Sequence, residues 1–267
     1  MDWGMRNRMA RIIKPSTGRT VMLAVDHGYF LGPTTGLENV GRAVKDLLPY
    51  ADALALTRGI LRHDINPHID TPIILRISGG TSILSEELLN EGITTSMKEA
   101  IRLNVSGVAF SITVGAKWER NTILGLSQVV DEAEEHGIPT LAVIAVGKDM
   151  VRDARYLSLA GRIAAEHGAR IVKTYYCEPG FDKVIDTCPV PVVIAGGKKI
   201  PEKEALEMAY KALQAGAVGV DMGRNIFQSE HPVAMIKAIK EVVHNNATAK
   251  EAYEFFESES KEKKVKA

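Results

Sequence analysis

Ile171-Val172-Lys173-Thr174-Tyr175-Tyr176 is a short run of β-favouring residues that one lysine interrupts. Gly168 precedes the run and Pro179-Gly180 follows it, so turn signals stand on both sides. An apolar run of this length between turn residues is typical of a strand in a parallel sheet that helices cover on both faces. The run therefore predicts a buried parallel strand whose lysine lies toward its C-terminal end.

Lys173 has two interpretations. An amine in a buried strand loses hydration, which favours the neutral form that attacks a carbonyl carbon and forms a Schiff base. A structural lysine would instead extend its ammonium group to solvent or pair it with a carboxylate. The position of the residue alone leaves both interpretations open.

Seven further apolar runs of strand length occur along the chain. They span residues 21–25, 51–56, 72–77, 107–114, 140–146, 190–195 and 218–222. Helical periodicity occurs between these runs at Leu126, Val129, Val130 and Ala133, at Leu159, Ile163 and Ala164, and at Leu206, Ala209 and Leu213. Eight strand–helix units over 267 residues match an α/β fold of the single-domain (β/α)8 TIM barrel type, which needs about 250 residues. A doubly wound open sheet is the alternative, because the alternation alone fits both.

The length and composition suit one domain over residues 1–267, since 45% of the residues are hydrophobic and 25% are charged. Residues 1–20 are expected to form a short helical lead-in before the first strand. Residues 257–267 mix charges of both signs and offer little to bury, so we expect a frayed charged tail.

Charge and cysteine content exclude several classes of protein. Thirty-three basic and 33 acidic residues give a formal net charge of zero, so a nucleic-acid partner is not expected. Cys177 and Cys188 show neither metal-ligand spacing nor a disulfide framework, which indicates a reducing, cytoplasmic setting. No stretch has the pattern of a signal peptide or of a membrane span, and no membrane partner is expected.

Polar and basic residues follow the predicted strands, at the end of a barrel where active sites lie. In chain order these strand-end residues are Asp26, His27, Arg58, Arg62, Arg76, Ser78, Lys148, Lys173, Lys198, Lys199 and Arg224. A chain without net charge therefore has many cations on one rim. This distribution predicts an anionic substrate, most simply a phosphorylated small molecule.

Two glycine loops strengthen the phosphate interpretation. Gly196-Gly197 and Gly223-Arg224 follow consecutive predicted strands, and residues 225–228 can form a short helix. Bare backbone amides at adjacent strand ends form the usual phosphate cradle of barrels, and glycine lets the phosphate approach them. One glycine pair alone would equally fit a tight turn.

Asp26 and His27 follow the first strand and have a structural alternative. The aspartate could cap the next segment, and backbone groups could satisfy the histidine. If the barrel closes, however, both residues share a mouth with Lys173 and could move protons beside a lysine iminium. The other histidines show no pairing typical of a metal site, so no metal is expected.

These residues and their surroundings resemble the class I, Schiff-base-forming aldolase family that includes archaeal fructose-bisphosphate aldolases and heptulosonate synthases. The matching stretches are residues 21–36, 171–176, 190–199 and 221–228. The resemblance implies Lys173 as the Schiff-base lysine and Asp26 and His27 as its proton-handling partners. It also implies a substrate and phosphate site at Gly196, Gly197, Gly223 and Arg224, with Ser78 as a further contact, no bound cofactor, and a homo-oligomer, by resemblance a decamer.

Within the family, the chain is most similar to the thiolase branch, through residues 2–5, 26–30, 147–153 and 173–176. This implies that coenzyme A cleaves a 3-hydroxy-2,4-diketone phosphate into dihydroxyacetone phosphate and acetyl-CoA. Aldolase members have an acid/base tyrosine at the fifth strand end, where this chain has Ala145. An aldolase that works without coenzyme A is the alternative enzyme, and a barrel that only binds a sugar phosphate is the alternative outside enzymes.

Overall fold

The computed structural model describes residues 1–146 and 151–265 and has a closed barrel of eight parallel strands. In barrel order the strands are β1 (Thr20–Ala24), β10 (Gly219–Met222), β9 (Val192–Ala195), β8 (Ile171–Tyr175), β7 (Thr140–Ile144), β6 (Gly107–Ile112), β3 (Ile73–Arg76) and β2 (Ala53–Thr57). Six of them lie within one of the eight predicted runs, and β1 and β2 each extend one residue beyond theirs. The predicted TIM barrel is confirmed, and the open-sheet alternative is wrong.

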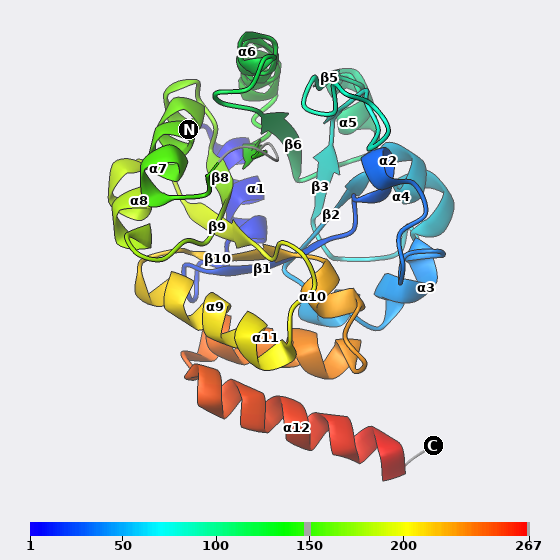
Figure 1. Cartoon of the computed structure of the whole chain (residues 1–267). Coiled ribbons are helices and arrows are strands. Elements are labelled where there is room, and N and C mark those ends of the chain that lie inside the picture. The colour runs from blue at the N-terminus through cyan, green and yellow to red at the C-terminus, as the bar shows by residue number, and fades with distance from the viewer. Residues whose placement is uncertain (147–150, 266–267) are drawn as a thin grey trace.

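Helices surround the strands (Figure 1). They are α1 (Trp3–Ile12), α2 (Gly28–Leu31), α3 (Val40–Lys45), the 3-10 helix η1 (Leu48–Tyr50), α4 (Arg58–Asp64), α5 (Met97–Arg102), α6 (Glu119–Glu135), α7 (Ala154–Glu166), α8 (Phe181–Thr187), α9 (Glu202–Gln214), α10 (Arg224–Phe227), α11 (Pro232–Asn245) and α12 (Ala249–Val265). The predicted apolar face of α6 is buried, as is that of α9. On α7 the buried positions are shifted, and Leu159 is exposed.

Alternation along the strands divides the core into two clusters. Outward-facing side chains such as Leu23, Phe110 and Val172 join the layer between barrel and helices. Inward-facing ones, including Ala24, Ala55 and Ala109, form a small cluster inside the barrel. Ile12 of α1 belongs to this inner cluster, and α1 lies behind the middle of the ring in Figure 1. The helix therefore closes the N-terminal end of the barrel and leaves the C-terminal end open.

Two features differ from the sequence-based expectation. The antiparallel pair β4 (Ser78–Gly79) and β5 (Gly92–Ile93) extends beyond the end of β3 and was not predicted. The expected frayed tail from residue 257 is wrong as far as Val265, because α12 continues through it. Phe256 of α12 is buried and Lys237 of α11 pairs with Glu259, so the outermost helix of Figure 1 is fixed to its neighbour.

None of the helices in residues 1–146 and 151–265 has the length and apolar character that crossing a membrane requires.

Candidate active site

A cavity of about 220 Å³ opens at the C-terminal ends of the strands. The charged and titratable side chains in its wall come mainly from the ends of four strands, β1, β3, β8 and β10. They are Asp26, His27, Arg76, Lys173, Asp221 and Arg224, and Glu91 joins them from the segment before β5. These side chains meet because alternate residues of each strand face the interior of the barrel. On β8 the inward-facing residues are Ile171, Lys173 and Tyr175, and on β10 they are Gly219 and Asp221. The structure thus brings together the three predicted catalytic residues.

Lys173 lies at the floor of this cavity and is only 9% exposed. Its Nζ lies 2.9 Å from Oδ2 of Asp221, on β10. Burial raises the pKa of the Asp221 carboxyl, although the charge of Lys173 and its hydrogen bond oppose the effect. Oδ1 of Asp221 is buried and has no hydrogen-bond partner in the described part of the chain. Asp221 is therefore suited to accept a proton from the lysine.

Asp26, at the end of β1, is held in its ionised form, unlike Asp221. Arg76 donates to its Oδ2 from Nε and from a terminal nitrogen, each at 2.8 Å. Burial alone would raise the pKa of the Asp26 carboxyl, but the charges of Arg76 and Lys173 outweigh it and hold the pKa at about 2. Asp26 is therefore a permanent negative charge beside Lys173 at neutral pH.

His27 is the neutral member of the group. Burial, together with the nearby cations Lys173 and Arg224, lowers its pKa to about 4 even though Asp26 acts in the other direction. Its ring lies edge-on to Phe227 at 5.8 Å between centroids. Nδ1 is buried without a hydrogen-bond partner among residues 1–146 and 151–265.

The two predicted glycine loops lie side by side above β9 and β10. A Cβ on Gly196 would come within 2.9 Å of Nδ2 of Asn225, so only glycine fits there. Asn225 donates to the carbonyl of Gly196 at 2.6 Å and accepts from the amide of Ile200 at 2.9 Å, which joins the loops. Arg224 begins the predicted short helix, and its buried Nε has no partner in the part of the chain that the structure describes.

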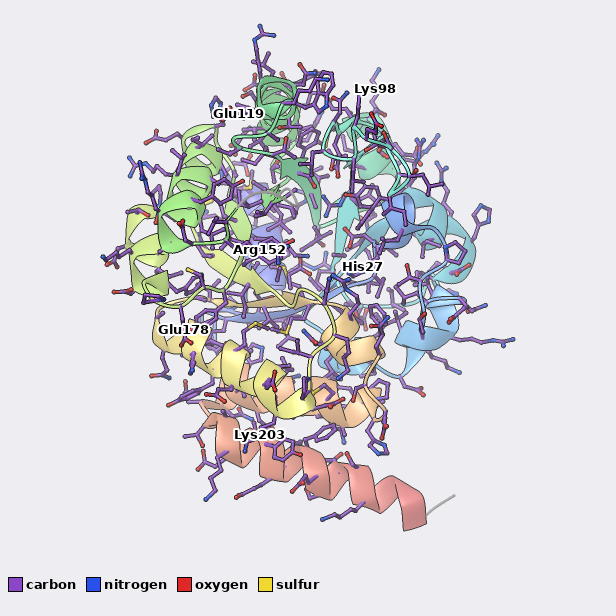
Figure 2. The ribbon with its side chains drawn as sticks, viewed as in Figure 1. His27, Lys98, Glu119, Arg152, Glu178 and Lys203 are labelled. Atoms are coloured by element: carbon purple, nitrogen blue, oxygen red, sulfur yellow. The ribbon has the colours of Figure 1, made fainter. Side chains whose placement is uncertain are left out.

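The predicted rim of cations is only partly directed at the cavity. Arg62 pairs with Glu99, and Lys199 pairs with Glu202 2.7 Å away. Lys148 lies outside the described residues. One cation beyond the predicted set joins the mouth: the Arg152 guanidinium lies 3.8 Å from the ring centroid of Tyr175, which is in the cavity wall. Figure 2 shows Arg152 and His27 near the middle of the ring of helices.

Ser78 lies apart from the phosphate loops, and its role as a substrate contact stays a prediction. Its strand β4 follows β3, across the barrel from β9 and β10. Its hydroxyl donates to Glu91 at 2.5 Å and accepts from the amide of Ser111. Ser78 therefore helps to fix Glu91, which in turn accepts a hydrogen bond from Tyr29 at 2.6 Å.

Sequence reasoning missed Asp221 as a functional candidate and identified Arg76 only as one cation of the predicted rim. Asp221 is a single carboxylate in an otherwise apolar strand, and Arg76 ends another. Both residues could have been recognised from the alternation of inward-facing and outward-facing positions along a strand. Asp221 lies two positions after the inward-facing Gly219, and Arg76 lies two positions after the inward-facing Ile74. Charged residues at the inner positions of barrel strands belong to the active site or to its support.

Comparison with known proteins places these observations in one family. Residues 20–229 match the family described as DeoC/LacD family aldolase. The chain is 57% identical over 259 residues to the 3-hydroxy-5-phosphonooxypentane-2,4-dione thiolase of Photorhabdus laumondii, covering 97% of this chain and 89% of that protein. The thiolase of the same name from Escherichia coli K12 has the same identity and coverage.

Solved structures of aldolases are similar to this chain over most of its length. An archaeal fructose 1,6-bisphosphate aldolase is 25% identical and superposes with a TM-score of 0.81, over 90% of this chain and 99% of that one. A second archaeal fructose-1,6-bisphosphate aldolase, with its catalytic Lys covalently bound to the carbinolamine intermediate of the substrate, is also 25% identical, with a TM-score of 0.80 and the same coverage.

Proposed function

Because the chain belongs to the DeoC/LacD family of aldolases, we propose that it is a Schiff-base-forming thiolase for 3-hydroxy-5-phosphonooxypentane-2,4-dione. Coenzyme A would cleave this diketone phosphate into dihydroxyacetone phosphate and acetyl-CoA. The proposal depends above all on the buried Lys173, whose Nζ lies in the catalytic cavity beside Asp221. The substrate is that of relatives that are 57% identical over nearly the whole chain.

Substrate binding begins at the phosphate. The amides of Gly196, Gly197 and Gly223 and the guanidinium group of Arg224 offer donors at neighbouring strand ends. This anchor leaves the ketone next to the phosphorylated carbon over Lys173, one strand away on β8. Positioning of this kind converts the attack of the amine into an intramolecular step.

Formation of the Schiff base requires a neutral amine. Asp221 accepts the proton of Lys173 across their 2.9 Å contact and can return it to the carbinolamine oxygen, which leaves as water. The resulting iminium is positive, and the ionised Asp26 stabilises it electrostatically.

Carbon–carbon cleavage follows from the iminium. The thiol gives its proton to neutral His27, and the sulfur forms a bond to the acetyl carbonyl carbon. When that carbon separates from its hydroxyl-bearing neighbour, the bonding electrons enter the iminium and leave an enamine. His27 then protonates the enamine carbon, and hydrolysis of the iminium releases dihydroxyacetone phosphate. In this scheme Lys173, Asp26 and His27 have the catalytic roles that the sequence suggested.

An aldolase without coenzyme A is the competing activity. Ala145 lines the cavity at the end of β7, and a methyl group donates no proton to a leaving aldehyde or alkoxide. The lack of a hydroxyl at this position supports the thiolase over the aldolase.

Borohydride trapping tests the proposal. The protein is incubated with dihydroxyacetone phosphate, reduced and weighed intact, and the modified peptide is mapped. We expect one adduct on Lys173 and none in Lys173→Arg. Acetyl-CoA formation from the diketone phosphate is then compared with aldol cleavage of fructose bisphosphate without coenzyme A. An absent adduct would overturn the Schiff base, and faster cleavage of fructose bisphosphate would identify the protein as an aldolase.

We further propose a homo-oligomer, a decamer by resemblance to the family, that acts in the cytoplasm. The free thiols of Cys177 and Cys188 support a reducing compartment. Light scattering on a sizing column measures the assembly directly, and a mass of one 29.1 kDa chain would refute the oligomer.

A further inference from the structure

The acetyl end of the bound diketone has to lie on the side of the mouth away from the phosphate. The glycine loops stand at the ends of β9 and β10, and β3 and β6 lie across the closed barrel from them. Arg76 and Ser111, from β3 and β6, form that opposite wall of the cavity. The thiol of the co-substrate must therefore reach the carbonyl carbon near Arg76.

The catalytic cavity itself does not accommodate a second large substrate. Its volume of about 220 Å³ is below the roughly 300–1,000 Å³ of pockets for drug-sized ligands. A five-carbon diketone phosphate fills such a space. The long arm that presents the thiol of coenzyme A needs an adjoining groove with an opening to solvent.

A cleft of about 270 Å³ meets this requirement at the ends of β2 and β3. It shares Tyr29 and Arg76 with the catalytic cavity, so the two spaces lie on either side of these side chains. The remaining wall is small and uncharged apart from one cation: Thr57, Gly59, Ser78, Gly79, Gly80, Thr94, Thr95 and Arg58. Arg58 is exposed and takes part in no ion pair within residues 1–146 and 151–265.

Tyr29 is the partition between the two spaces. A Cβ on Gly79 would lie 3.1 Å from the Tyr29 ring, so the ring rests directly on the β4–β5 hairpin. Its hydroxyl donates to Glu91 at 2.6 Å, and the Arg76 guanidinium lies 5.2 Å from the ring centroid. A thiol that passes the edge of this ring enters the catalytic cavity beside Arg76.

We propose that this cleft is the subsite for the thiol co-substrate, with the pantetheine arm along Gly59 and Gly79 and the phosphates of coenzyme A at Arg58. The narrow arm has amide groups that match the Thr57 hydroxyl and the glycine backbone of the wall. Arg58 supplies the charge that attracts the phosphates. The inference rests on the proposed thiolase function and specifies where its second substrate binds.

The subsite delivers one reactant of a balanced reaction. The sulfur–hydrogen bond breaks, its proton goes to His27, and a carbon–sulfur bond forms at the acetyl carbon. The bond between that carbon and the hydroxyl-bearing carbon breaks, and its electrons enter the iminium to form an enamine. The proton on His27 is then transferred to the enamine carbon. Coenzyme A and the diketone phosphate are thereby converted into acetyl-CoA and dihydroxyacetone phosphate, with no oxidant or reductant.

Two substitutions in the cleft test the assignment by steady-state formation of acetyl-CoA. Gly59 has open space around its Cβ position, so Gly59→Leu should fill the groove and raise KM for coenzyme A about 10-fold or more. Arg58→Ala should raise the same KM about 5-fold, the size of an exposed charge pair. KM for the diketone phosphate should change by less than about 2-fold in both variants.

Matched controls separate the subsite from general damage. Gly59→Ala adds one methyl group and should change KM for coenzyme A far less than Gly59→Leu does. Lys98→Ala removes a cation on α5 outside the cleft, toward the outer edge in Figure 2, and should have no effect. With pantetheine, which lacks the phosphates, Gly59→Leu should still raise KM, whereas Arg58→Ala should not.

The assignment is overturned if Gly59→Leu and Arg58→Ala leave KM for coenzyme A unchanged, or if they raise KM for both substrates equally. Failure of the thiolase function itself is recognised separately, because the wild-type protein would then form no acetyl-CoA. Borohydride trapping of dihydroxyacetone phosphate on Lys173 should be unaffected in both variants, which shows that the catalytic cavity is intact.

Discussion

Asp221 and Asp26 are buried carboxylates beside the same lysine, yet their surroundings favour opposite protonation states. Burial raises the pKa of Asp221, whereas Arg76 and Lys173 outweigh burial at Asp26 and lower its pKa to about 2. Groups whose surroundings separate their pKa values divide the acid–base work of a site between them. Asp221 therefore exchanges protons with Lys173, and Asp26 supplies a fixed charge.

This division predicts the effect of Asp221→Asn. The amide keeps the shape of the side chain but accepts no proton, so we expect Schiff-base formation to slow by about 10²–10³-fold. The rate of borohydride trapping with dihydroxyacetone phosphate measures this step, and inorganic phosphate binding should be unchanged. Glu134→Gln, in an ion pair with Arg170 away from the cavity, is the control. A trapping rate close to wild type would remove Asp221 from the mechanism.

His27 makes the stability of the protein sensitive to acid. Its pKa is about 4 in the folded protein and 6.5 ordinarily, so below pH 6.5 the unfolded chain binds a proton that the folded chain does not. The stability present above pH 6.5 is therefore lost as the pH falls toward 4, by about 3 kcal/mol at about 1.4 kcal/mol per pKa unit.

Urea unfolding at pH 7, 5.5 and 4 and at one protein concentration measures this loss. His27→Gln has no titrating ring, so its stability should fall by about 3 kcal/mol less than that of the wild type over this range. His68→Gln, at an exposed loop residue, should follow the wild type. Parallel pH curves for wild type and His27→Gln would contradict the buried neutral state.

At the scale of elements, strands were predictable where periodicity and turn residues agreed, and this held for all eight strands of the barrel. The β4–β5 pair has only two residues in each strand, too few for any pattern to appear. Helix α12 was missed because its many charges conceal the buried Phe256, which becomes an anchor only when α11 lies beside it. Asp26, His27 and Lys173 were predictable from strand ends, whereas Asp221 required the parity of a closed barrel.

Helix α11 contacts the N-terminal side of the barrel through His244, among other residues. Nε2 of His244 lies 2.6 Å from Oδ2 of Asp52, and Nδ1 lies 2.8 Å from the Thr17 hydroxyl. The same Asp52 oxygen accepts from the amide of Val21 at 2.7 Å, at the start of β1. The contact thus links the last barrel helix with the first two strands.

We expect His244→Ala to lower the free energy of unfolding by about 2–3 kcal/mol, because it removes a partner of a buried carboxylate. The contact lies at the N-terminal end of the barrel, which contributes to stability and lies away from the active site. We therefore expect kcat of the native fraction to stay unchanged. Urea unfolding and acetyl-CoA formation measure the two quantities. His136→Ala, at the exposed C-cap of α6, is the control, and an equal effect of both would argue against the contact.

For the whole molecule, the decisive contact is the seam where the last strand meets the first. Gly219 of β10 pairs with Thr20 of β1, and a Cβ on Gly219 would lie 1.9 Å from the Thr20 carbonyl oxygen. At the other end of the seam, a Cβ on Gly223 would lie 2.2 Å from the carbonyl oxygen of Ala24. Closure therefore needs glycine at the first residue of β10 and at the residue that directly follows this strand.

Gly219→Ala should accordingly weaken the entire barrel. The added methyl group meets backbone, which cannot rotate aside, so we expect a loss of more than about 3 kcal/mol in the free energy of unfolding. Urea unfolding measures the loss, and Gly92→Ala is the control because nothing lies within 4 Å of its Cβ position. Equal stability of the two variants would contradict the close approach at the seam.

Gly219→Ala should also impair the active site, although Gly219 lies at the opposite end of β10 from the mouth of the barrel. Asp26 and His27 follow β1, and the phosphate loop at Gly223 follows β10, so the seam helps to hold these two parts of the site together. Any Gly219→Ala protein that folds should bind phosphate more weakly and form the Lys173 adduct more slowly. Wild-type trapping in a destabilised Gly219→Ala protein would show instead that the mouth closes independently of the seam below it.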